Sequence, residues 1–221
     1  MEIISYSHYS DNVARAHEKI DTESLNSFIQ LLDCAFLSEQ TVFIFGNGGS
    51  GATASHFCED LGKGTLFDVN SPVRLRVMSL TDNSPYILAW ANDCGYETIF
   101  EQQLKNFAKP DDIAIAISGS GNSKNLIRAI EYANTIDMTT VGFTGYDGGK
   151  LRRLTDYQIH IPCTDMGIVE SVHLSVMHYI VMVLSKRFKS KIISNQPKSN
   201  GYQIAGIKYP TTSFVESTSQ R

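Results

Sequence analysis

Two stretches of this chain share one pattern, in which a run of β-branched and aromatic residues ends in a glycine- and serine-rich turn. The first run is VFIF at 42–45, followed by GNGGS at 46–50. The second run is IAIAI at 113–117, followed by SGSGNS at 118–123. Each turn is predicted to open a helix, whose free N–H groups and positive dipole end attract anions. Two such loops on one sheet predict one anionic ligand, a phosphate, held from both sides.

Strand-like runs alternate with helical patterns along the chain. The predicted strands are 41–45, 73–79, 113–117, 139–143 and 156–162. Helices are predicted near 11–19, 25–36, 50–62, 84–91, 96–107, 123–135 and 168–188. Strands separated by helices pair through right-handed crossovers into a parallel sheet that is covered on both faces. We therefore predict an α/β fold with a doubly wound five-stranded parallel sheet flanked by helices, whose ligands bind at the carboxyl ends of the strands.

The domain organisation follows from length and composition. A chain of 221 residues suffices for one α/β domain, which we place at 1–188 with the N-terminal helices included. Residues 189–221 are rich in Ser, Thr, Asn, Gln and Lys. We expect this C-terminal extension to be an arm ordered on a neighbouring subunit.

Composition argues against several classes of protein. A net charge of −4 makes nucleic-acid binding unlikely for the whole molecule, although the residues from Lys186 onward are basic. Four cysteines without a CxxC pair indicate reduced thiols. The first residues lack the features of a signal peptide, and no stretch approaches the roughly 20 apolar residues of a membrane span. We expect a cytoplasmic protein without a membrane partner.

A dinucleotide site is the main rival interpretation, because residues 46–51 match GxGxxG. Such a site needs an acidic residue at the end of the second strand, but the strand at 73–79 runs into Leu80 and Thr81. Asp68 lies before that strand, and no Gly-Lys-Ser/Thr is present for a nucleoside triphosphate. We therefore expect no nucleotide cofactor, and a small sugar phosphate as the ligand.

Four segments in order carry a family resemblance. They are the first loop followed by His56-Phe57, the segment ANDCGY at 91–96, the loop at 118–123 and TGYDGG at 144–149. From about residue 10 to 187 the chain resembles the sugar isomerase (SIS) domain family, and within it the phosphoheptose isomerases. The resemblance implies a homotetramer with active sites between subunits. It also implies interconversion of sedoheptulose 7-phosphate, or a related ketose phosphate, with an aldose phosphate for surface polysaccharide.

The resemblance also implies site residues. The expected phosphate- and substrate-binding residues are Asn47, Gly48, Gly49, Ser50, Asp93, Ser118, Gly119, Ser120, Asn122 and Ser123. His56 and His178 match histidines that bind zinc in metal-bearing members, and His178 also matches a proposed general acid or base.

The departures from the family fall in the chemical part of the site. The family glutamate four residues after the first histidine is Asp60 here, and the family threonine of the second loop is Gly119. A family Asp and Gln at the start of the last helix are Gly167 and Glu170 here. The catalytic groups are therefore rearranged, while the expected phosphate groups remain.

Aldose–ketose isomerisation needs a base over the reacting carbons and an acid or electrophile at the oxygens. Glu170, His178 and Asp60 are the candidate catalytic residues. The set His56, Asp60, Glu170 and His178 could hold zinc or another divalent ion if the helices converge. The sequence leaves open whether Glu170 is a ligand or the base. It also leaves open a non-catalytic SIS module that senses a sugar phosphate or serves as an interaction scaffold, which the changes at Asp60 and Gly119 favour.

Overall fold

The computed structural model describes residues 5–38, 40–194, 203–204 and 207–208. Its helices are α1 (Tyr6–Glu18), α2 (Thr22–Ser38), α3 (Gly48–Glu59), α4 (Ser84–Cys94), α5 (Ile99–Phe107), α6 (Lys124–Thr135), α7 (Leu151–Leu154) and α8 (Met166–Ser194). A π-helical turn, η1 (Asp60–Gly64), continues α3, and a 3-10 turn, η2 (Tyr96–Thr98), precedes α5. The strands are β1 (Thr41–Gly46), β2 (Arg76–Ser79), β3 (Ile113–Ser118), β4 (Thr139–Thr144), β5 (Tyr157–His160), β6 (Gln203–Ile204) and β7 (Ile207–Lys208).

Five of the strands form one parallel sheet in the order β2-β1-β3-β4-β5, while β6 and β7 pair with each other. The register places Phe43 beside Ala114 and Ile115 beside Val141. The predicted α/β fold with a doubly wound five-stranded parallel sheet is confirmed. Because β1 and β3 are adjacent while the chain crosses to β2 between them, the order reverses at this pair.

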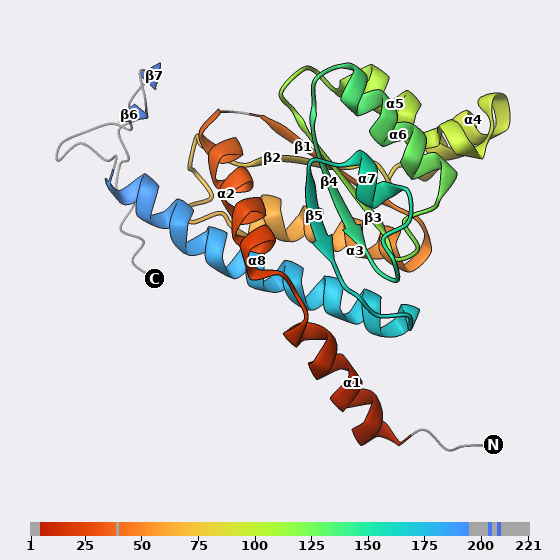
Figure 1. The fold of residues 1–221 in the computed structure, drawn as a ribbon. Coiled ribbons are helices and arrows are strands. Elements are labelled where there is room, and N and C mark those ends of the chain that lie inside the picture. Colours follow the sequence, from red (N-terminus) through yellow and green to blue (C-terminus); the bar gives the residue numbers. More distant parts are fainter. Residues whose placement is uncertain (1–4, 39, 195–202, 205–206, 209–221) are drawn as a thin grey trace, which may run out of the picture.

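Helices cover both faces of the sheet (Figure 1), and each face carries its own hydrophobic core. On β1, Val42 and Ile44 pack in the core that includes α2, α3 and α8, while Phe43 packs in the core that includes α5 and α6. This alternation follows from the period of two along a strand, which sends successive side chains to opposite faces. Both faces of the central strands are apolar because helices cover both.

The last helix differs from the sequence expectation. α8 runs from Met166 to Ser194 and is by length and hydropathy long and apolar enough to cross a membrane, since an 18-residue window within Met166–Ile193 has a mean hydropathy of 1.6. The sequence had predicted that no stretch approaches the length of a membrane span, and this helix meets that test. In the structure 44% of that window is buried, where α8 packs as a core helix, whereas Tyr179 and Met182 are exposed.

Two predicted boundaries moved for reasons visible in the pairing. The strand predicted at 73–79 begins only at Arg76, because Arg76 pairs with Thr41, the first residue of β1. Residues 73–75 therefore have no neighbour on that strand. The helix predicted near 11–19 extends over Tyr6–Glu18, with the Ser5 side chain accepting a hydrogen bond from the His8 N–H at 3.3 Å.

The expected C-terminal extension, 189–221, lies mostly outside the described residues. The structure describes its first six residues as the end of α8, followed by β6 and β7. The four cysteines all lie in the described part of the chain and are free thiols.

Candidate active site

The two glycine- and serine-rich loops lie side by side at the carboxyl ends of β1 and β3, where the strand order reverses. Such a reversal is the usual ligand position in an open α/β sheet, since the flanking loops diverge to opposite faces and leave a crevice. α3 follows the first loop and α6 follows the second, so both helix N-termini lie at this end of the sheet.

The first loop turns tightly into α3. A Cβ at Gly46 would lie 2.6 Å from the Ser50 carbonyl oxygen, and Gly48 has a φ of 53°. Both positions therefore favour glycine. Ser50 is buried in the first turn of α3, which carries no acidic residue.

Asn47 ties the first loop to the second half of the site. Its amide group donates to Asn125 Oδ1 and accepts from Asn125 Nδ2, both at 2.9 Å. The Tyr96 hydroxyl also donates to Asn47 Oδ1 at 2.9 Å. Asn47 is the N-cap residue of α3, yet its side chain makes no capping hydrogen bond among the described residues. Its side chain therefore fixes the loop, which leaves the backbone N–H groups to face a ligand.

The second loop is organised by its own serines. Ser118 Oγ accepts from the Gly121 N–H at 3.1 Å, and Ser120 Oγ accepts from the Asn122 N–H at 3.3 Å. Because these hydroxyls accept locally, each keeps its proton to donate to a ligand oxygen. Ser123 is the N-cap of α6, and its side chain makes no capping bond within the described residues.

The turn at 145–149 supports the second loop. The Gly145 N–H donates to the Gly119 carbonyl at 2.8 Å, and the Lys150 N–H donates to Asn122 Oδ1 at 3.2 Å. A Cβ at Gly121, where φ is 64°, would lie 2.0 Å from the Gly148 carbonyl oxygen. This turn, the fourth segment of the family resemblance, is thus packed on the loop.

Three of the four predicted metal ligands come together. His56 and Asp60, one turn apart, meet His178 of α8, and one ligand atom of each lies within 4.8 Å of the others. Asp60 Oδ2 lies 3.5 Å from His56 Nε2 and 3.7 Å from His178 Nε2. Ligand atoms on a tetrahedral zinc ion lie about 3.3 Å apart, given bonds of about 2.0–2.1 Å. Two imidazoles and one carboxylate, all partly exposed to solvent, therefore fit a zinc ion that keeps a fourth position open.

Glu59 lies outside this cluster. It pairs with Lys63 Nζ at 3.4 Å, while Asp60 faces the histidines. The π-helical turn begins at Asp60, and such turns are frequent at functional sites.

Glu170 also lies outside the cluster and approaches the first loop instead. A Cβ at Gly49 would lie 2.6 Å from Glu170 Oε1 and 2.7 Å from Oε2. Its carboxylate therefore occupies the space beside the first turn of α3. One turn earlier on α8, Met166 lies over the second loop, where a Cβ at Gly119 would be 2.3 Å from its Sδ.

Asp93 is not brought to the loops by the contacts of the described residues. It lies exposed on α4, where its carboxylate accepts from Asn92 Nδ2 at 2.7 Å. The structure describes all of α4, and none of its residues is buried. Tyr96, just beyond this helix, does reach the first loop through its hydroxyl.

Two other histidines belong to the scaffold. His173 is buried and its Nε2 lies 3.3 Å from the Thr144 carbonyl oxygen, while its Nδ1 finds no partner among the described residues. Burial lowers the pKa of His173 to about 4. His160 Nδ1 lies 3.0 Å from Thr144 Oγ1, and burial together with the charge of Arg152 lowers the pKa of His160.

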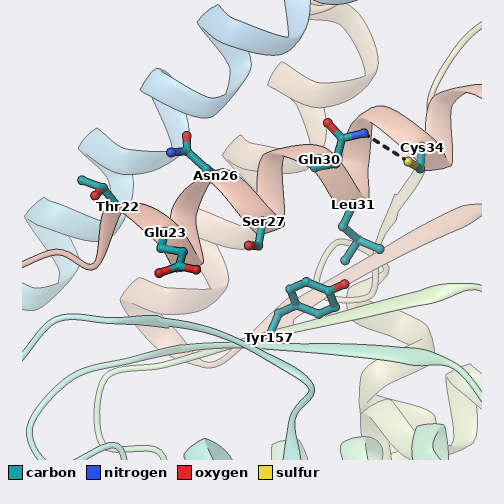
Figure 2. A pocket seen from close by; sticks show the side chains of 8 residues that line it. All are labelled: Thr22, Glu23, Asn26, Ser27, Gln30, Leu31, Cys34 and Tyr157. Carbon is teal, nitrogen blue, oxygen red and sulfur yellow. Dashed lines mark hydrogen bonds between the residues drawn. The ribbon is translucent and has the colours of Figure 1, made fainter.

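Two hollows differ in their relation to this site. One of about 260 Å³ lies on the first loop and is lined by Gly48, Ser55, Thr81, Ile87 and Tyr96, among others. A larger one of about 670 Å³ lies between α2 and Tyr157 of β5 (Figure 2). No candidate site residue lines this larger hollow, so we place the site at the loops.

A SIS domain profile matches residues 5–145. The chain belongs to the SIS domain family. A probable phosphoheptose isomerase of Thermoplasma acidophilum is 34% identical over 180 residues, which cover 81% of this chain and 97% of the relative. A phosphoheptose isomerase of Mycobacterium tuberculosis is 35% identical over 164 residues, covering 74% of this chain and 82% of the relative.

Solved structures agree with this assignment. A phosphoheptose isomerase from Neisseria gonorrhoeae superposes with a TM-score of 0.74 at 25% identity, covering 81% of this chain and 96% of that chain. A phosphoheptose isomerase from Francisella tularensis has a TM-score of 0.76 at 24% identity, and the match covers 82% of this chain and 95% of that chain. The predicted SIS resemblance is confirmed.

Sequence reasoning missed two residues of this SIS site. Asn125 gave no signal, since an asparagine early in a helix is commonly read as a local cap. Met166 gave none either, because its contact with Gly119 depends on where α8 begins. Tyr96 lies in one of the segments that carried the family resemblance. Its hydrogen bond to Asn47 could not be predicted, because the two residues are far apart in the sequence.

Proposed function

We propose that this protein is a sugar-phosphate aldose–ketose isomerase of the phosphoheptose isomerase type, acting on sedoheptulose 7-phosphate or a related ketose phosphate. The observation that carries this proposal is the arrangement at one end of the sheet. Two loops suited to an anion flank the reversal of strand order, and a carboxylate and a His-Asp-His cluster lie on the helices beside them. Relatives named phosphoheptose isomerase support the same conclusion.

The reaction moves a proton between neighbouring carbons through an enediol, so it needs a base and an acid within reach of the substrate. Glu170 is the base in this proposal, because its carboxylate faces the first loop and lies outside the metal cluster. His178, whose Nε2 faces the metal cluster, exchanges protons with the substrate oxygens through its other ring nitrogen in this proposal. Asp60 orients His56 and His178 through its contacts with both rings.

The substrate contacts are assigned to the two loops. In this proposal the hydroxyls of Ser118, Ser120 and Ser123 and the N–H groups of 47–50 bind the sugar phosphate, with Gly119 and Asn122 shaping the second loop. Asp93 contacts the substrate once α4 is covered by a neighbouring copy.

A divalent ion, zinc in this proposal, would be held by His56, Asp60 and His178. When bound, it would polarise the oxygens of the reacting carbons. No nucleotide cofactor takes part in the proposed reaction. A scaffold that only binds sugar phosphate is less favoured, because it has little reason to keep this ligand set together with Glu170.

We further propose that the chain acts as a homotetramer in the cytoplasm, on the way to surface polysaccharide. Large apolar side chains are exposed on two helices, with Leu88 on α4 66% exposed and Met182 on α8 49% exposed. α1 packs along α8 and otherwise extends from the body (Figure 1). Second copies of the chain covering these helices would remove that apolar surface from water.

Two variants test the assignment of roles. Glu170→Gln and His178→Ala should each lower turnover of sedoheptulose 7-phosphate by about 10²–10⁴-fold, the usual contribution of a general base or acid. Binding of inorganic phosphate should survive in Glu170→Gln. Turnover is followed by NMR of the aldose product. Wild-type rates in both variants would show that these roles are wrongly assigned.

A further inference from the structure

A third hollow lies at the end of β5, the edge strand of the sheet. Its volume is about 340 Å³, and small-molecule sites fall in a range of roughly 300–1,000 Å³. The turn between α1 and α2, the helix α7 and the strand β5 contribute to its lining. Five of its lining residues are polar or charged, namely Lys19, Asp21, Ser24, Arg152 and His160. None of them belongs to the candidate active site.

Two cations line this hollow without an anionic partner. Lys19 caps the end of α1 and Arg152 lies in α7, and neither makes an ion pair with another described residue. Among the described residues, Asp21 is the one carboxylate of the lining, and both its oxygens are engaged. Oδ1 accepts from the Glu23 N–H at 3.0 Å, and Oδ2 accepts from the Ser24 hydroxyl at 2.6 Å. The two cations are therefore left to bind an anion.

Arg152 is held in place by the backbone around it. A Cβ at Gly148, where φ is 87°, would lie 2.5 Å from Arg152 Cδ, so the stem of the arginine packs on this turn. The Arg152 carbonyl accepts from Gln158 Nε2 at 2.9 Å, which ties α7 to β5. A side chain that is already packed loses less rotamer freedom when it binds a ligand.

His160 adds a directed hydrogen-bonding group. Its Nδ1 lies 3.0 Å from Oγ1 of the buried Thr144, and its Nε2 has no partner among the described residues. The positive charge of Arg152, together with burial, lowers the pKa of His160, which agrees with the two side chains lining one hollow. In the tautomer whose Nδ1 accepts from the Thr144 hydroxyl, Nε2 carries a proton and can donate it to a ligand oxygen.

Apolar side chains also line the hollow, through Ile20, Ile159 and Pro162. An inorganic ion would leave this surface in contact with water, whereas the carbon part of an organic ligand would cover it. The lining therefore favours a ligand that has both an anionic group and an apolar part.

We propose that the hollow at the end of β5 is a second binding site, which takes the phosphate group of a small organic molecule. A phosphomonoester carries about two negative charges at neutral pH, which match the charges of Lys19 and Arg152. The planar guanidinium of Arg152 is suited to bind two phosphate oxygens at once. This inference goes beyond the proposed function and does not depend on the isomerase reaction.

NMR of the His160 imidazole tests the site, because this ring lies in its lining. The full chain with ¹³C-labelled histidine is titrated with inorganic phosphate and with phenyl phosphate at constant ionic strength, and His160→Gln assigns the signal. We expect both probes to shift the His160 signal saturably. Phenyl phosphate should bind more tightly, because its ring can cover the apolar part of the lining.

Variants locate the binding event. Arg152→Gln and Lys19→Gln should each weaken phenyl phosphate about tenfold or more, the effect of losing one hydrogen bond to a charged group. Arg153→Gln is the matched control, because Arg153 is exposed on the same helix and does not line the hollow. It should behave as the wild type. Ser120→Ala, in the second loop of the candidate active site, should leave the His160 titration unchanged.

Three results would overturn the inference. One is a His160 signal that does not shift with phenyl phosphate at millimolar concentrations. Another is equal weakening by Arg152→Gln and Arg153→Gln, which would indicate a general attraction of anions to positive charge. The third is a His160 shift that disappears in Ser120→Ala, which would place the bound phosphate at the active site. Circular dichroism of each variant verifies that it is folded.

Discussion

The side-chain amides of Asn47 and Asn125 hydrogen-bond each other twice, at 2.9 Å in each direction. Asn47 precedes α3 and Asn125 lies in the first turn of α6, so this pair holds the two loops at a fixed separation. Asn125 is buried, with 2% of its surface exposed, and water therefore cannot readily replace the partner. A sugar phosphate that spans both loops needs that spacing.

Asn125→Ala should therefore affect stability and substrate binding together. It leaves the half-buried Asn47 amide with Tyr96 alone, at a cost of about 1 kcal/mol in the free energy of unfolding. KM should rise because the loops lose their common anchor. Tyr96→Phe removes only the hydrogen bond from the Tyr96 hydroxyl to Asn47, so it should change both the free energy of unfolding and KM less than Asn125→Ala does. Urea unfolding and steady-state kinetics give the two values, and an unchanged KM for Asn125→Ala would refute the coupling of the loops.

Met166 occupies the space beside Gly119, at the position where the family resemblance places threonine. Gly119→Thr would put a Cβ within 2.3 Å of Met166 Sδ, so the methionine must move. Because the Met166 thioether lies near the end of a flexible, partly exposed side chain, we expect the variant to lose no more than about 1 kcal/mol of stability. Adding Met166→Ala should recover part of that loss, with a coupling of at least about 0.5 kcal/mol in a double-mutant cycle. Strictly additive effects would mean that the two residues do not constrain each other.

Metal binding distinguishes two neighbouring carboxylates. Asp60→Asn should reduce zinc affinity by more than about tenfold, since even outer-shell partners contribute about 10–100-fold. Glu59→Gln is the matched control, because Glu59 pairs with Lys63 and faces away from the histidines. Chelator competition and metal content after dialysis provide the measurements. Equal zinc retention by the two variants would exclude the His-Asp-His cluster as the site.

The buried His173 predicts a dependence of stability on pH. Its pKa is lowered from 6.5 to about 4 in the folded state by burial, so between these values the unfolded chain binds more protons. Stability should therefore fall as pH decreases from about 6.5 to about 4, by up to ~3 kcal/mol. The free energy of unfolding, measured with urea at several pH values, should change less steeply with pH in His173→Gln than in the exposed control His8→Gln. If the free energy of unfolding of His173→Gln depends on pH as steeply as that of the control, other titrating groups cause the dependence.

The sequence predicted the sheet, its strands and the position of both loops, because periodicity and glycine-rich turns are local signals. It also predicted that His56, Asp60 and His178 would meet, although that meeting rested on the family resemblance. The start of β2 was missed because the register with Thr41, a distant residue, decides it. The sequence could not predict that Glu170 lies beside Gly49, because this contact depends on how α8 crosses the loops.

Isomerase chemistry is tested most directly by NMR of sedoheptulose 7-phosphate with the zinc-loaded protein in heavy water. We predict deuterium at the carbon beside the carbonyl together with new aldose phosphate signals, and neither with Glu170→Gln. If the sugar phosphate binds, as its line broadening would reveal, but neither exchange nor aldose appears with the wild type, the proposed isomerase function is contradicted for this substrate.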